Sequence, residues 1–154
     1  MNFTDNALQL LEKLLNPLQS IFQLGTRLYV AKQFLQSGWL KVTSWQTTLA
    51  LFHDEYHVPL LPPDVAAVVG SFGELFFPVL LVLGIGGRIG PLGLSAVNVM
   101  AVISYSQVLL AEGNEAAIGQ HILWGFMLLM LALFGNGSLA LDRFWRKAPD
   151  SRSA

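Results

Sequence analysis

The chain contains no cysteine among its 154 residues. Disulfide bonds, iron–sulfur clusters, heme thiolates and catalytic or redox-active thiols are therefore excluded. Charged residues are also scarce, because they make up only 12% of the chain while 53% of its residues are hydrophobic. A soluble domain carries roughly 25% charged residues. A chain this poor in charge cannot cover a globule of its size with ionic groups, so the composition indicates an integral membrane protein.

The few charges nearly balance, and the formal net charge at pH 7 is -1. Binding to nucleic acid through phosphate contacts needs a basic surface, so nucleic acid is excluded as a partner. The length allows one compact domain, and the lipid bilayer is the partner that the composition indicates.

Long apolar segments predict the fold. A membrane-spanning helix needs about 20 mostly apolar residues. The expected spans are residues 18–39, 65–86, 89–110 and 117–135. The first span is the weakest, because it contains Arg27, Lys32 and several glutamines. We therefore predict an all-α fold, a four-helix transmembrane bundle within residues 18–141.

Two further helices are expected to be amphipathic. Within residues 1–17, leucines recur at helical spacing between polar residues, which predicts a helix lying on the membrane surface. Asn16-Pro17 is expected to end that helix. A short external helix is expected over Trp45 to Tyr56, where apolar side chains fall on one side.

The basic residues predict the orientation. Six of them belong to segments that four spans would place on one side: Lys13, Arg88, Arg143, Arg146, Lys147 and Arg152. The opposite loops, 40–64 and 112–115, contain a single basic residue, Lys41. The positive-inside rule then predicts that both termini, including a basic tail over 142–154, are cytoplasmic. The expected location is the bacterial cytoplasmic (inner) membrane.

Polar residues inside the expected spans are the candidates for function, because such groups are costly in lipid and usually face the bundle interior. Counting 1.5 Å per residue from the ends of the spans places Arg27, Glu74 and Asn98 near the midplane. We expect a buried Arg27–Glu74 ion pair with Asn98 as its neighbour. Lys32, Gln36, Tyr105 and His121 should then complete a polar pocket toward the outside.

Two interpretations of this pocket remain open. The charged pair can simply lock two helices together, or the pocket can hold a proton relay, a substrate or a quinone. A quinone is a reasonable ligand because its carbonyls would accept hydrogen bonds from Lys32, His121 or Tyr105.

A second candidate site lies in the external segment His53-Asp54-Glu55-Tyr56-His57. Two histidines four residues apart share a helical face and can bind one metal ion. The segment is not the HExxH motif of zinc hydrolases, because Asp54 stands where that motif has glutamate. A loose copper or zinc site at His53 and His57, with Glu55 helping, and a solvated polar rim are the alternatives.

Four stretches between Arg27 and Arg143 resemble the DoxX family of small four-helix membrane proteins. The stretches are Arg27-Leu-Tyr with Phe34 and Gly38-Trp-Leu-Lys41; Glu55-Tyr56-His57-Val58-Pro59-Leu60-Leu61-Pro62-Pro63; Gly73-Glu74-Leu-Phe-Phe-Pro78-Val-Leu-Leu-Val-Leu-Gly84 followed by Arg88; and Phe134-Gly135-Asn136-Gly137-Ser138-Leu139-Ala-Leu-Asp142. The last departs slightly, with Asn136 where the family often has proline. The resemblance implies that Arg27, Lys41 and Glu74 are buried or rim polar positions.

The resemblance also implies a role beside other proteins, because relatives are subunits or partners of membrane oxidoreductases and others look like companions of copper-binding peptide systems. The leading hypothesis is an accessory membrane subunit of a redox or metal-stress system, binding a quinone or similar small ligand. The alternatives are copper handling at the external histidines and a non-catalytic scaffold that assembles a protein complex or homo-oligomer. A stand-alone enzyme is least favoured, because no nucleophile–base set is visible.

Overall fold

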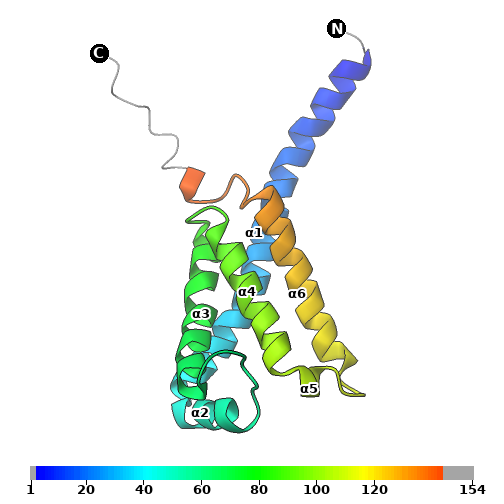
Figure 1. Cartoon of the computed structure of the whole chain (residues 1–154). Helices are drawn as coiled ribbons and strands as arrows, with labels where there is room; N and C mark the ends of the chain where they lie inside the picture. The colour runs from blue at the N-terminus through cyan, green and yellow to red at the C-terminus, as the bar shows by residue number, and fades with distance from the viewer. Residues whose placement is uncertain (1–2, 144–154) are drawn as a thin grey trace, which may run out of the picture.

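The computed structural model describes residues 3–143, and every regular element in that range is a helix (Figure 1). The helices are α1 (Phe3–Thr43), α2 (Trp45–Asp54), α3 (Pro63–Leu83), α4 (Ile89–Ser104), α5 (Ser106–Leu109) and α6 (Glu115–Phe134). The all-α prediction is confirmed. The four expected spans correspond to the second half of α1, to α3, to α4 with α5, and to α6.

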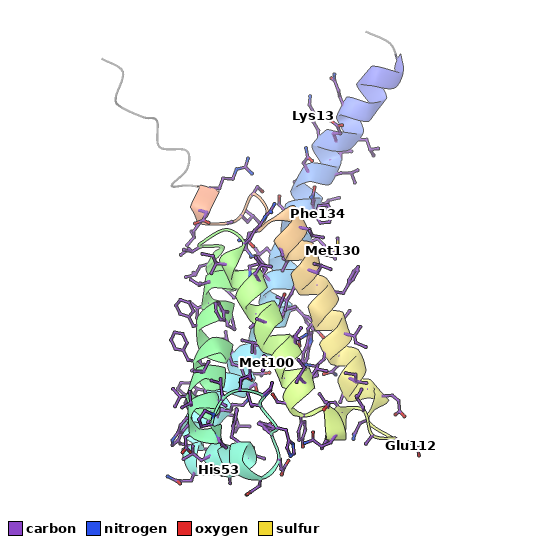
Figure 2. All side chains as sticks on the ribbon, viewed as in Figure 1. Lys13, His53, Met100, Glu112, Met130 and Phe134 are labelled. Carbon is purple, nitrogen blue, oxygen red and sulfur yellow. The ribbon has the colours of Figure 1, made fainter. Side chains whose placement is uncertain are left out.

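Four long helices lie side by side, and the short ones gather at one end of the bundle (Figure 1). We call this the α2 end, and Figure 2 places His53 and Glu112 there. The opposite end, which we call the arm end, carries the start of α1, the turn between α3 and α4, and the segment after α6. The loops therefore group as the sequence predicts, while the side that faces the cytoplasm stays a prediction.

The predicted break at Asn16-Pro17 is wrong, because α1 continues through Pro17. Proline in a helix removes the N–H that would bond the carbonyl four residues earlier, here that of Lys13. Residues 11–19 are all exposed, so water can supply the missing donor. The expected surface helix is therefore the first part of α1, and it projects from the bundle (Figure 1).

Two helices, α3 with 21 residues and α6 with 20, are long and apolar enough to cross a membrane. Only 39% and 17% of their most apolar windows are buried, whereas the core helix of a soluble protein is mostly buried. Their exposed apolar side chains suit contact with lipid. The 16-residue α4 is apolar but only about 24 Å long. A bundle in which all four long helices cross the membrane therefore stays a prediction.

The centre of the bundle is a compact apolar cluster with contributions from four helices. Its buried members are Val30, Ala31, Phe34, Leu81, Leu94, Leu128 and Leu131. A smaller cluster of Phe52, Ala66 and Ala67 packs α2 against α3. Gly90 brings α4 onto α3 so closely that a Cβ there would lie 3.0 Å from the backbone nitrogen of Leu81.

The close approach at Gly90 gives a stability prediction. Gly90→Val would push a branched side chain into the backbone of α3 and should lower the free energy of unfolding by about 1–3 kcal/mol. Gly119→Val is the matched control, because a Cβ at Gly119 would meet nothing within 4 Å. Urea unfolding in detergent, followed by circular dichroism, measures both variants, and equal losses would contradict the close contact.

Candidate functional site

A cavity of about 670 Å³ lies among α1, α3, α4 and α6 toward the α2 end. That volume falls within the roughly 300–1,000 Å³ of small-molecule sites. The walls are mostly apolar, with side chains such as Phe34, Phe77, Val97 and Met100. The residues with polar side-chain groups along the walls are few: Gln33, Ser37, Lys41, Tyr56, Glu74, Ser104, Tyr105, His121 and Trp124, whose indole N–H has no partner among the described residues.

An ion pair between α1 and α3 forms one part of the cavity wall. Lys41 Nζ lies 2.7 and 2.8 Å from the two carboxylate oxygens of Glu74 and donates to Ser37 Oγ at 2.8 Å. All three N–H groups of the ammonium are therefore engaged. Gly38 makes room for this pair, because a Cβ there would stand 3.0 Å from Glu74 Cβ. The pair is mostly buried, with side-chain exposures of 14% and 10%.

The expected Arg27–Glu74 ion pair is wrong, because Glu74 pairs with Lys41 and Arg27 lies at the arm end. Arg27 is expected at the midplane only if the first span begins at residue 18. In the structure Ser20 contacts Ser138, in the segment after α6, and Arg27 is level with Val82 in the last turn of α3. Arg27 is therefore shallower than the estimate placed it, and Lys41 is the cation that reaches Glu74.

Arg27 is almost completely buried, with 1% of its surface exposed, and its partners are backbone carbonyls. Nη1 donates to the carbonyl of Asn136 at 2.7 Å, and Nη2 donates to those of Val82 at 3.0 Å and Leu139 at 3.4 Å. The Val82 carbonyl belongs to the last turn of α3, where the helix dipole favours a cation. The guanidinium thus holds α1, α3 and the segment after α6 together.

We call residues 135–142 the closing segment, because they lie across the arm end of the bundle (Figure 1). Asn136 Nδ2 donates to the carbonyl of Gly87 at 2.7 Å. The Asp142 carboxylate accepts from the amides of Gly86 at 3.2 Å and Gly87 at 2.6 Å. Ser138 Oγ lies 2.6 Å from Ser20 Oγ on α1. These contacts give the closing segment a structural role.

The last turn of α3 shows why the closing segment matters. The final four carbonyls of a helix have no partner within it. Here those of Leu80 and Leu81 accept from the amides of Ile85 and Gly84, at 3.1 and 3.2 Å, in the following turn. The Val82 carbonyl accepts from Arg27, and the Leu83 carbonyl accepts from the amide of Leu141 at 3.0 Å. Every carbonyl of that turn is therefore satisfied.

On the far wall, Asn98 of α4 fixes the ring of His121 of α6. Asn98 Nδ2 donates to the backbone carbonyl of His121 at 2.9 Å, so its Oδ1 faces His121 Nδ1, also at 2.9 Å. Because Oδ1 can only accept, Nδ1 carries the proton in the neutral ring and Nε2 has a free lone pair. No group in the described part of the chain bonds Nε2. His121 thus presents a hydrogen-bond acceptor.

Two tyrosines lie where the chain returns from α2. Tyr105 donates from its hydroxyl to Glu55 Oε2 at 3.1 Å. The Tyr56 ring packs edge-on against Tyr105 and Phe52, with centroids 5.0 and 4.9 Å apart. Burial is the main cause that raises the pKa of Tyr56, so its hydroxyl stays protonated at neutral pH. Among residues 3–143 the Tyr56 hydroxyl has no hydrogen-bond partner, which leaves a free donor beside the cavity.

The structure brings only some of the expected pocket residues together. Glu74, Tyr105 and His121 line the cavity, and Asn98 stands behind His121. Lys32 and Gln36 are exposed on the outer side of α1, and Arg27 lies at the arm end. Lys41 was implied by the family resemblance alone. Tyr56 was missed, because a phenol in a proline-rich return loop carries no periodic signal that points it inward.

The expected metal site is not assembled. Two histidines four residues apart share a face only on a continuous helix, but α2 ends at Asp54. His53 Nε2 instead lies 2.9 Å from Asp64 Oδ1, and the backbone amide of His57 donates to the carbonyl of Ser104 at 2.8 Å. Glu55 is engaged by Tyr105. Residues 3–143 contain no cluster of three or more histidine, cysteine, aspartate or glutamate side chains suited to a metal ion.

The buried guanidinium gives a second prediction. Arg27→Met removes the donors of at least two short charge-assisted hydrogen bonds and should lower the free energy of unfolding by about 3–6 kcal/mol. Arg88→Met is the control, because Arg88 is exposed and makes one 3.4 Å contact to the Leu133 carbonyl. Urea unfolding in detergent measures both. A loss at Arg27 no larger than that at Arg88 would show that the closing segment does not depend on Arg27.

The Lys41–Glu74 pair gives a third prediction. Glu74→Leu alone leaves a mostly buried ammonium unpaired and should cost about 3–5 kcal/mol, whereas Lys41→Met with Glu74→Leu should cost much less. The exposed His53–Asp64 contact supplies a control, since Asp64→Asn should change stability by no more than about 1 kcal/mol. Unfolding of the single and double variants measures the coupling. If the double variant loses as much free energy of unfolding as the two single variants together, the ion pair is contradicted.

Comparison with known proteins supports one family. The sequence model of the DoxX family matches residues 22–107, which is more than half of the 154 residues and includes Lys41 and Glu74. An uncharacterized protein from Haemophilus influenzae is 26% identical over 132 residues, which cover 82% of this chain and 85% of the relative. No solved structure matches the chain at a significant level. The chain belongs to the DoxX family of membrane-associated proteins.

Proposed function

We propose that this chain is a four-span membrane protein that binds a small lipophilic ligand with a quinone-type head, as an accessory subunit of a membrane redox system. The observation that carries the proposal is the cavity of about 670 Å³, whose apolar walls hold the free Tyr56 hydroxyl and the free His121 Nε2. Ligand sites are typically apolar clefts with a few well-placed polar groups.

The chemistry of Tyr56 and His121 suits a quinone and its reduced form. A quinone carbonyl accepts hydrogen bonds, and the Tyr56 hydroxyl is a donor. A quinol hydroxyl donates, and His121 Nε2 is an acceptor held in place by Asn98. Lys41 has no spare N–H, so it contributes positive charge near the head and no further hydrogen bond. The apolar walls would surround the ring and the tail.

Family relationship supports the accessory role, because the DoxX resemblance implies partners among membrane oxidoreductases. We place the protein in the bacterial cytoplasmic membrane with the arm end toward the cytoplasm, because Lys13, Arg88 and Arg143 all belong to that end. Copper handling has less support than ligand binding, because His53 and His57 do not share a helical face. A scaffold without a ligand is the outcome if the cavity binds nothing.

Ligand binding is tested with the purified full chain in nanodiscs and a short-tailed ubiquinone analogue, by calorimetric titration. Tyr56→Phe removes one hydrogen bond of about 0.5–1.5 kcal/mol, so the dissociation constant should rise about twofold to tenfold. Ala101→Phe places a ring in the cavity and should abolish binding. Tyr29→Phe is the matched control on the outer face of α1 and should leave binding unchanged.

A second ligand tests whether the cavity recognises the head group. An alkyl alcohol of the same tail length should bind more weakly than the ubiquinone analogue, because it lacks the ring carbonyls. Equal affinity for the two ligands, or an Ala101→Phe variant that binds like the wild type while retaining its helical circular dichroism, would contradict the proposal.

A further inference from the structure

The first part of α1 projects beyond the bundle as a helical arm, which we define as residues 3–22 (Figure 1). Figure 2 shows Lys13 on this arm, far from the other helices. From residue 11 onward the arm exposes large apolar side chains at 50–75% of their surface. These side chains are Leu11, Leu14, Leu15, Leu18, Ile21 and Phe22. Nothing in the described part of the chain covers them.

Four of these residues follow the spacing of a coiled-coil seam. Leu11, Leu15, Leu18 and Phe22 follow one another at intervals of four, three and four residues. This alternation places apolar side chains along one seam of a helix that packs against a parallel helix. The exposed positions Gly25 and Tyr29 continue the alternation into the bundle. We call these six positions the α1 seam.

The contacts that α1 makes with the closing segment lie on other faces of the helix and leave the α1 seam uncovered. Pro17 is not one of the seam positions and lies on another side of the helix. Its missing N–H and its ring therefore do not disturb a partner. Ser20, which is bonded to Ser138 of the closing segment, also lies away from the seam. The closing segment therefore holds α1 from the opposite side.

The arm suits a second helix better than a membrane surface. Helices that lie on membranes are rich in lysine and arginine on their polar face. The arm carries Asp5 and Glu12 against the single base Lys13. It is also continuous with the rest of α1, so it points away from the bundle and does not turn to lie across its end (Figure 1).

We propose that two copies of this chain associate through the α1 seam, as a short parallel coiled coil that continues into the bundle at Gly25 and Tyr29. Two copies inserted in one membrane have the same orientation, so their arms are parallel and in register. A Cβ at Gly25 would meet nothing within 4 Å, and so small a residue allows two helices to approach closely. The seam ends before Lys32, because two facing ammonium groups would repel.

Cysteine cross-linking tests the proposal cleanly, because the natural chain has no cysteine. Single variants Leu11→Cys, Leu15→Cys and Leu18→Cys, oxidised in native membranes, should form disulfide-linked dimers. Lys13→Cys, Asn16→Cys and Gln19→Cys, off the seam on the same arm, should cross-link several-fold less. Equal cross-linking at all six positions would overturn the proposal. So would an absence of cross-linking at the seam positions, which would point to lipid around the arm, or a maximum on another face, which would point to another contact.

A second measurement avoids dependence on disulfide geometry. Leu18→Glu places a charge in the seam and should convert the purified protein in detergent from dimer to monomer in mass photometry. Gln19→Glu adds the same charge beside the seam and should leave the dimer intact. A wild-type monomer, or equal behaviour of the two variants, would overturn the proposal, whereas ligand binding in the cavity is expected to survive both.

Discussion

A cation buried among apolar helices must find its hydrogen-bond partners within the protein, and α1 carries two such cations. Arg27 finds backbone carbonyls at the arm end, and Lys41 finds the Glu74 carboxylate beside the cavity. Each contact joins α1 to α3, and that at Arg27 also recruits the closing segment. The two contacts fix the register of α1 on the bundle. The position of the cavity, and of the arm beyond it, follows from that register.

Much of this architecture could be predicted from apolar runs and turn residues. The helices over 63–83, 89–104 and 115–134 lie where the sequence places them, because length and hydropathy depend on local sequence. The partner of Glu74 could not be predicted in the same way. It depends on where α1 begins to contact the bundle, and the continuous helix through Pro17 shifts that point. Which side chains pair between helices depends on how the helices pack. Counting residues from the ends of the spans predicts such pairs poorly.

The residues of the candidate site also divide into those that the sequence predicts and those that depend on how the helices pack. Glu74, Tyr105 and His121 were identified as polar residues in apolar surroundings, and all three line the cavity. Lys32 and Gln36 share that pattern but face outward, because the helical phase of α1 is set by Arg27 and Gly38. Tyr56 became visible only through the fold, which returns the loop after α2 against Tyr105. An apolar chamber with one engaged ion pair and several unpartnered polar groups, among them Tyr56 and His121, is the result.

The pairing of Lys41 with Glu74 can be measured directly in lipid bilayers by solid-state NMR. Dipolar dephasing between ¹⁵Nζ of Lys41 and ¹³Cδ of Glu74 reports their separation, and each signal can be assigned with a single conservative variant. Strong dephasing, as for two groups in direct contact, is the expected result. Absence of dephasing for this pair, together with dephasing between the Arg27 guanidinium and Glu74, would contradict the register of α1 on which the cavity depends.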